Sequence, residues 1–160
     1  MTLKEYVNQE GKNSEGYAFN GKGECTPLMA AAWGEHFQIV KYLIEQGEAD
    51  PNISSLGKNA LHYAAGYNIK NIELIELLLT NMSLNSINKK DWDGGTPLDC
   101  AYINKSPIQQ KIIDLIRSKG GKREDEIKQE PLDAASDAKT LLVLYKEVYP
   151  DGTPLVCACE

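Results

Sequence analysis

The chain has 160 residues, of which 42% are hydrophobic and 25% are charged, and its formal net charge is −6. This composition is that of an ordinary globular protein with a core of its own, so folding requires neither disulfides nor a metal. The absence of a basic stripe excludes a nucleic-acid partner, and the absence of an apolar run of about 18–20 residues excludes a membrane-spanning segment.

The N-terminal segment, residues 1–22, combines a short helix with a long loop in our prediction. Residues 3–7, LKEYV, have the composition of a helix. Residues 10–25, EGKNSEGYAFNGKGEC, are rich in glycine and predict a loop that contains a first hairpin. The start of the chain lacks the basic and apolar regions of a signal peptide, and four cysteines without framework spacing indicate a reducing compartment. We therefore expect a cytoplasmic protein.

Three segments that share one internal pattern follow. They begin at Thr26 (TPLMAAAWGEHFQIVKYLIEQG), Asn59 (NALHYAAGYNIKNIELIELLL) and Thr96 (TPLDCAYINKSPIQQKIIDLIRSKG), at spacings of 33 and 37 residues. Thr26 and Thr96 are good helix N-caps, and Pro27 and Pro97 stand in a first helical turn, where a missing N–H costs nothing. Each segment therefore predicts a short alanine-rich helix, a polar break and a second helix.

The second helix of each segment carries a single apolar face. Its apolar residues recur at helical spacing, which buries one side of an amphipathic helix. These residues are Ile39, Val40, Leu43 and Ile44 in the first segment, Leu74, Ile75, Leu77 and Leu78 in the second, and Ile112, Ile113, Leu115 and Ile116 in the third. Turn-forming stretches, GEADPN at 47–52 and NKKDWDGG at 88–95, separate the segments.

This pattern resembles the ankyrin-repeat family, whose repeats share a T-P-L-H-x-A core and a period near 33. The resemblance covers about residues 23–121. It implies an all-α fold, a solenoid of stacked helix-turn-helix units with short β-hairpin turns. The expected domains are an N-terminal capping helix and loop (1–22), three repeats (about 23–54, 55–91 and 92–121) and an acidic helical tail (122–160). The tail would begin as a charged helix or linker, and would hold one degenerate repeat and the start of another.

The chain departs from the family pattern at several polar positions. His62 keeps the family's histidine, but Met29 and Asp99 replace it in the other two repeats, so the usual hairpin hydrogen bonds are not expected there. The glycine of the family's Gly-His pair has moved to Gly34, two residues before His36. Ser106 and Pro107 are predicted to form a new N-cap and first turn for the last outer helix.

No residue pattern favours catalysis. His36 and His62 match structural positions of the family, which leaves no histidine for a Ser-His-Asp or Cys-His arrangement. Cys100 is expected to act as a small buried apolar residue. The Cys157–Cys159 pair lacks the further ligands that zinc needs, and the closing CACE is not a usual prenylation box. We expect no enzyme activity, cofactor or metal, with a redox or metal role for this pair as the least favoured alternative.

A recognition surface is the remaining functional feature. The resemblance implies that partners are held on a concave face, by hairpin tips and by the exposed ends of the first helices. Carried over residue by residue, this surface comprises Lys22 and Trp33 in the first repeat, Leu56, Lys58 and Tyr67 in the second, and Trp92, Asp93, Ile103 and Asn104 in the third, with Cys25 and Ser55 beside them. Tryptophan is enriched in binding hot spots, although Trp33 fits a packing role between repeats equally well.

The sequence thus predicts a monomeric, non-catalytic module that binds another protein, and neither nucleic acid nor membrane. The alternative is a targeting domain of a larger enzyme or pathogen effector, truncated here and delivered to a host cytosol in the second case. The closing segment DGTPLVCACE, residues 151–160, favours a chain that ends inside a repeat, because Cys157 aligns with Cys100.

Overall fold

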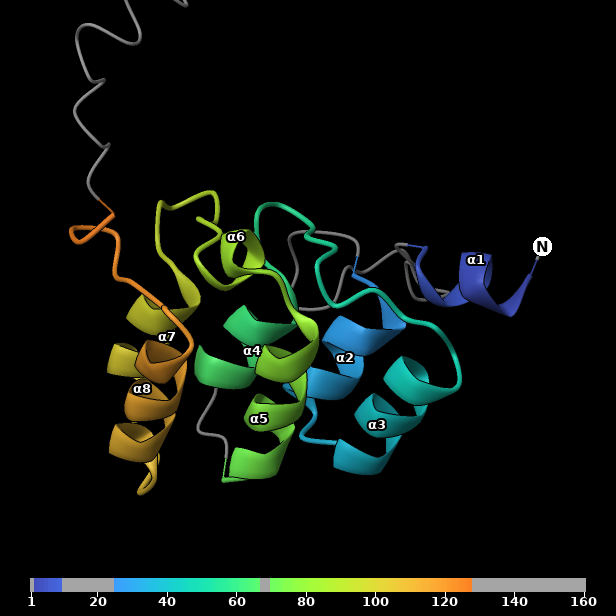
Figure 1. Cartoon of the computed structure of the whole chain (residues 1–160), viewed down its shortest axis with the longest axis horizontal. Coiled ribbons are helices and arrows are strands. Elements are labelled where there is room, and N and C mark those ends of the chain that lie inside the picture. Colours follow the sequence, from blue (N-terminus) through green and yellow to red (C-terminus); the bar gives the residue numbers. More distant parts are fainter. Residues whose placement is uncertain (1, 10–24, 67–69, 128–160) are drawn as a thin grey trace, which may run out of the picture. The chain divides into compact units, whose positions relative to one another are not determined.

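The computed structural model describes residues 2–9, 25–66 and 70–127. These residues form eight helices and no strand (Figure 1). The helices are α1 (Leu3–Val7), α2 (Pro27–Trp33), α3 (Phe37–Glu45), α4 (Ala60–Gly66), α5 (Ile72–Asn81), α6 (Leu84–Ile87), α7 (Pro97–Ile103) and α8 (Gln109–Ser118). The degenerate repeat and the Cys157–Cys159 pair that the sequence predicts lie outside the described residues.

The helices pair as the three predicted repeats. In each repeat a short inner helix packs on a longer outer helix, which gives the pairs α2/α3, α4/α5 and α7/α8. The inner helices α2, α4 and α7 pack in that order in one layer, and the outer helices α3, α5 and α8 form a second layer (Figure 1). The all-α ankyrin-type fold that the sequence predicts is therefore confirmed.

The start of each inner helix is held by a side-chain cap. Thr26 Oγ1 accepts the N–H of Met29 at 3.3 Å, and Thr96 forms a reciprocal capping box with Asp99. In the second repeat Asn59 replaces the threonine, and its Oδ1 accepts the N–H groups of Leu61 and His62 at 3.1 and 3.3 Å. Asparagine performs the same capping function because its carbonyl oxygen reaches the same unpaired helical N–H groups.

Small residues allow the inner helices to approach closely. Ala31, Ala64 and Ala101 hold the same position in α2, α4 and α7, and all three are buried. Ala64 is completely inaccessible to solvent, in the middle of the inner layer. A larger side chain there has no room without a shift of the neighbouring helices.

We expect Ala64→Leu to destabilise the protein by roughly 1–3 kcal/mol, because it overpacks this layer. Denaturant unfolding followed by circular dichroism would measure the loss. Ala30→Leu is the matched control, since Ala30 is only half-buried at the end of the inner layer and its replacement should cost less. Equal stability of the Ala64 variant and the wild type would show that the inner helices are not closely stacked.

Three asparagines join the loops of successive repeats. Asn8 Nδ2 donates to the carbonyl of Glu48 at 3.1 Å, and its Oδ1 accepts the N–H of Asp50 at 2.7 Å. Asn88 bonds in the same way to the carbonyl of Gly120 and the N–H of Lys122, at 3.0 and 2.7 Å. In the middle repeat, Asn52 Oδ1 accepts the N–H of Ser83 at 2.8 Å.

Helices α1 and α6 therefore hold equivalent positions. Each precedes an asparagine that bonds to the segment after an outer helix, α3 in the first repeat and α8 in the third. Both helices end one residue before the bonded asparagine, and both bury one apolar residue, Val7 in α1 and Ile87 in α6. The connection from the asparagine to the cap of the next inner helix differs in length. It spans 18 positions from Asn8 to Thr26, but 8 from Asn88 to Thr96. The sequence pattern did not predict α6, because four residues are too few to show a helical period.

The C-terminal end of the described stack is covered by residues 122–126. Arg123 Nε donates to Asp99 Oδ1 at 2.9 Å, and the N–H of Glu124 donates to Asp99 Oδ2 at 2.8 Å. The Arg123 guanidinium also lies over the Tyr102 ring, 4.9 Å from its centroid. Partial burial opposes the charge on Asp99, but these donors and those of Thr96 outweigh it and hold the pKa of Asp99 below its ordinary value. Asp99, which stands where the family has a histidine, thus forms hydrogen bonds of its own with Thr96, Arg123 and Glu124.

The last outer helix begins later than the sequence predicts. Ile108 is the N-cap of α8, and Pro107 and Ile108 form a turn before it. Ser106 still bonds locally, because its Oγ accepts the N–H of Ile108 at 3.3 Å. The buried Ser106 therefore supports the turn and not the first turn of the helix.

Candidate protein-binding surface

The hairpin of the second repeat ends in a two-residue turn, Leu56–Gly57. Ser55 and Lys58 exchange both backbone hydrogen bonds, at 2.8 and 2.9 Å. Leu56 and Gly57 both have positive φ, 50° and 78°, as in a type I′ turn. Gly57 is required here, since a Cβ on it would lie 2.7 Å from the Asp91 Cα.

Leu56 is an unusual residue for this position. A leucine in the left-handed region is strained by roughly 1–2 kcal/mol, because its Cβ crowds the following carbonyl oxygen. Its side chain is also 54% exposed, so burial does not compensate for the strain within the described part of the chain. Local strain of this kind is typically kept at functional positions.

The next hairpin places Trp92 beside Leu56. The N–H of Trp92 donates to the carbonyl of Leu56 at 3.3 Å, which joins the two hairpin tips. Trp92 is 60% exposed, and the neighbouring Asp93 is exposed as well. Asp91 shapes this turn, because its Oδ1 accepts the N–H groups of Asp93 and Gly95, both at 3.0 Å. We call Leu56, Trp92 and Asp93 the hairpin patch.

Lys58 contributes to the stacking of the hairpins. Its ammonium group lies 3.6 Å from the nearly buried carboxylate of Asp91, and its own side chain is mostly covered. Lys58 therefore connects the second and third repeats, and it presents little of its charge to a partner.

His62 lies beneath these hairpins. It is buried, and its Nδ1 accepts the N–H of Asn59 at 3.2 Å. Its Nε2 is buried without a hydrogen-bond partner among the described residues. Burial lowers the pKa of His62 to about 4, although the charge of Asp91 and the carbonyl of Gly95 oppose this shift. His62 is therefore neutral at physiological pH, consistent with a structural role.

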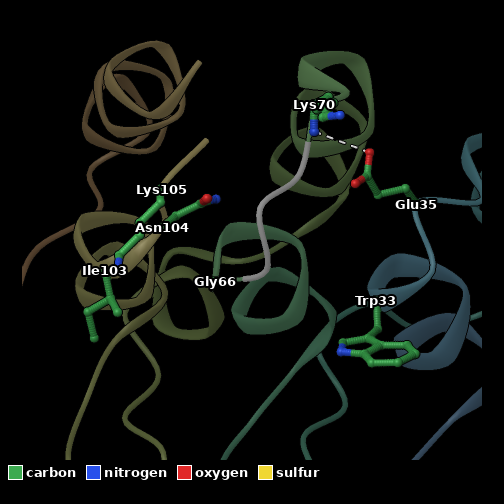
Figure 2. A pocket seen from close by; sticks show the side chains of 7 residues that line it. All are labelled: Trp33, Glu35, Gly66, Lys70, Ile103, Asn104 and Lys105. Carbon is green, nitrogen blue, oxygen red and sulfur yellow. Dashed lines mark hydrogen bonds between the residues drawn. The ribbon is translucent and has the colours of Figure 1, made fainter. Parts of the chain in front are cut away.

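A second exposed region lies at the far ends of the inner helices. Trp33, Gly66 and Ile103 are the last residues of α2, α4 and α7. Figure 2 shows the Trp33 ring and the Ile103 side chain on either side of Gly66, and they line a hollow of about 600 Å³. Ile103 is 75% exposed. We call Trp33 and Ile103 the helix-end patch.

Charged residues that the sequence prediction missed surround the helix-end patch. Lys70, Lys105 and Glu35 line the same hollow. Glu35 Oε2 accepts the backbone N–H of Lys70 at 3.1 Å (Figure 2). Glu35 has a φ of 56°, so it takes the left-handed position after a helix that glycine usually fills. The sequence feature that indicated this irregular turn was the position of Gly34, two residues before His36 and not directly before it.

The remaining predicted surface residues do not belong to these patches, although Asn104 lines the same hollow as Trp33 and Ile103. Asn104 is only 2% exposed. Its Nδ2 donates to the carbonyl of Ala65 at 2.7 Å, and its Oδ1 accepts the N–H of Ser106 at 2.8 Å, so it serves the internal structure. Lys22 and Tyr67 lie outside the described residues. The structure thus groups five predicted residues into two patches, with Leu56, Trp92 and Asp93 in one and Trp33 and Ile103 in the other.

Two features of the described residues bear on metal and thiol chemistry. No group of three or more His, Cys, Asp or Glu side chains among them could hold a metal ion. Burial raises the pKa of the Cys100 thiol to about 11, which suppresses its thiolate form. No helix in this part of the chain is long and apolar enough to cross a membrane.

Stacked helix pairs with projecting hairpins define a helical-repeat protein. The family model for ankyrin repeats, in 3 copies, matches residues 2–91 and 28–126. The chain belongs to the ankyrin-repeat family. Ankyrin repeats generally mediate protein–protein interaction and are typically not catalytic.

Three longer proteins share this region. The chain is 34% identical over 121 residues to the ANK repeat-containing protein nipk-1 of Caenorhabditis elegans, which covers 74% of this chain and 19% of that protein. It is 31% identical over 108 residues to zinc finger CCCH domain-containing protein 47 of Arabidopsis thaliana, over 63% of this chain and 18% of the relative. It is also 31% identical over 108 residues to alpha-latrotoxin-Lg1a of Latrodectus geometricus, over 66% of this chain and 7% of the toxin. The chain spans less than a fifth of each relative's length.

Proposed function

We propose that this chain is a non-catalytic module that binds a partner protein through the hairpin patch and the helix-end patch. The observation that carries the proposal is Leu56, an exposed leucine held in a left-handed turn next to the exposed Trp92. A strained apolar residue at a hairpin tip gains stability only when another surface covers it. Aromatic and aliphatic anchors of this kind dominate the energetics of protein interfaces.

The proposed mechanism is complementarity of shape and charge on a rigid stack. The two patches lie at the two ends of the inner helices, so one partner that contacts both would lie along the inner layer. A specific and stable complex buries about 800 Å² on each partner, which requires more area than either patch offers alone. We also propose a cytoplasmic location, because the cysteine pattern predicts a reducing compartment.

Leu56→Asn should raise stability and weaken partner binding at the same time. Asparagine tolerates the left-handed region and forms the preferred Asn-Gly type I′ turn with Gly57, so we expect a gain of about 1 kcal/mol in the free energy of unfolding. Loss of the apolar contact should reduce affinity by about tenfold. The measurements are denaturant unfolding, and titration of a partner recovered by affinity purification from the native cell.

Leu84→Asn provides the matched control for this experiment. Leu84 is about as exposed as Leu56, but it lies in α6 and outside both patches. Its replacement should leave affinity unchanged. Unaltered affinity of the Leu56 variant would remove the hairpin patch from the binding surface, whatever its stability.

A second candidate function is that the repeats target a larger protein to its site of action. The observation that favours it is the length of the relatives, of which this chain spans 7% to 19%. Intact-mass analysis of the native protein tests this proposal. A native mass equal to the 17.7 kDa of this chain would contradict it.

A further inference from the structure

The hollow at the helix-end patch combines apolar walls with a net positive charge. Its apolar side chains are those of Trp33 and Ile103, and its charged side chains are those of Lys70, Lys105 and Glu35. Figure 2 shows Lys105 on the side of Ile103 and Glu35 on the side of Trp33. Among the described residues that line the hollow, two ammonium groups therefore accompany one carboxylate, whereas the whole chain has a formal net charge of −6.

The backbone that carries the two lysines is held in place. The N–H of Lys70 donates to Glu35 Oε2 at 3.1 Å, and the next residue, Asn71, is the N-cap of α5. Lys105 follows Asn104, whose buried side chain donates to a carbonyl at the end of α4 at 2.7 Å. Both lysine side chains are nevertheless exposed. A ligand therefore meets two cations on an ordered frame, which lowers the entropy cost of binding.

The two ammonium groups are not used to complete the helix ends beside them. The last carbonyls of a helix need donors from outside, and lysine side chains often supply them. Here neutral amides do so. Gln109 Nε2 donates to the carbonyls of Ala101 and Tyr102, at 3.1 and 2.8 Å, and Asn104 performs the same function for α4. Neither lysine of the hollow forms an ion pair with any residue that the structure describes, so within that part of the chain both charges remain available.

We propose that the helix-end patch binds an acidic segment of the partner protein, in which an apolar side chain enters the hollow and a neighbouring Asp or Glu lies against Lys70 and Lys105. This inference rests on the function proposed above, and it adds the chemistry of the partner. Trp33 and Ile103 supply the apolar contact, and the two lysines supply the charge that a carboxylate complements. A basic segment would bring like charges together in a contact that excludes water, so the hollow disfavours it.

A library of random peptides, displayed on phage and selected on the full chain, provides the test. The selected peptides should pair Asp or Glu with an adjacent apolar residue. They should lose binding to Trp33→Ala, which marks the helix-end patch as their site. A labelled synthetic copy of one such peptide then serves as the probe, and fluorescence anisotropy measures its dissociation constant.

Changes of charge in the hollow should alter this dissociation constant in opposite directions. Lys70→Gln and Lys105→Gln should each raise it about threefold, which is the usual size of the effect of an exposed ion pair. Glu35→Gln should lower it by a similar factor, because it removes a like charge and keeps an oxygen for the N–H of Lys70. The control combines Lys41→Gln with Lys111→Gln, which changes the net charge as much as the two lysine variants together but alters exposed residues of α3 and α8 outside the hollow. It should leave the dissociation constant unchanged.

Two kinds of failure can be told apart. Selected peptides that need Trp33 but carry no acidic residue, or a dissociation constant insensitive to both lysines and to Glu35, would overturn this proposal and leave the proposed function standing. Peptides that bind Trp33→Ala as tightly as the wild type would remove the helix-end patch from the binding surface, and this proposal with it. A selection that yields no peptide would also overturn it, since a short acidic segment should suffice for binding.

Discussion

Acidification from pH 6.5 to pH 4 should lower the free energy of unfolding by about 3 kcal/mol, and His62 should account for this loss. Its pKa is lowered from 6.5 to about 4 in the folded protein, mainly by burial. Between these two values the unfolded chain binds a proton that the folded chain excludes. The contribution of His62 is therefore complete above pH 6.5 and is lost as the pH falls towards 4.

The structure shows why the proton is excluded. Nδ1 accepts the N–H of Asn59 at 3.2 Å, and a proton on Nδ1 would exchange this bond for a donation to Asn59 Oδ1, 2.9 Å away, without gaining a partner for the buried Nε2. Nε2 lies buried, with no partner of hydrogen-bond geometry in the described part of the chain. A charged imidazole would be desolvated beneath the two hairpins without adequate compensation.

Denaturant unfolding of the wild type and of His62→Gln, over a series of pH values, tests this prediction. The variant should be less stable at neutral pH, and it should lack the extra slope between pH 6.5 and 4. Asp99 affects the free energy of unfolding in a separate, lower pH range. Because its pKa is lowered in the folded protein, its contribution is lost only as the pH falls below the ordinary value of 3.8. Equal slopes for wild type and His62→Gln would disprove the assignment.

Replacement of both tryptophans by alanine should weaken partner binding by at least about 2 kcal/mol, or roughly 30-fold. Trp92 belongs to the hairpin patch and Trp33 to the helix-end patch. Both rings are partly exposed, so their truncation removes contact area on the proposed surface while the repeat core remains. Titration calorimetry with the recovered partner would measure the loss.

The two single variants and one control separate the patches. Trp92→Ala alone tests the hairpin patch, and Trp33→Ala alone tests the helix-end patch. Tyr6→Ala removes an aromatic ring about as exposed as that of Trp92 from α1, outside both patches, and should leave affinity unchanged. Unchanged affinity in the double variant, with the fold intact, would exclude the proposed surface.

The repeat architecture could be predicted because its signals are local. Thr26 and Thr96 cap helices through atoms three residues away, and the apolar residues of α3, α5 and α8 recur at helical spacing. The connections between repeats could not be predicted in this way. Asn8 and Asn88 bond to residues 40 and 34 positions away, and asparagines in polar loops resemble ordinary turn residues in the sequence.

The candidate site likewise depends partly on local sequence signals and partly on contacts between distant segments. The sequence marked residues around the hairpin tips and helix ends as candidates, but residue type alone did not decide which of them are exposed. Ile103 and Asn104 are adjacent, and the apolar isoleucine points to solvent while the polar asparagine is buried. The reason is that Asn104 satisfies the carbonyl of Ala65 in the neighbouring repeat, which is a contact between distant segments.

The sequence by itself determined the inner and outer helices of the three repeats, the Thr26 and Thr96 caps and the order of the repeats, because these depend on residues within one or two helical turns. Only the tertiary structure decided which apolar residues remain on the surface. Ile39 and Ile112 carry the same side chain at the same repeat position, yet one is half-exposed and the other fully buried. Burial depends on the neighbouring repeat, and the pattern within a single repeat holds no information about that neighbour.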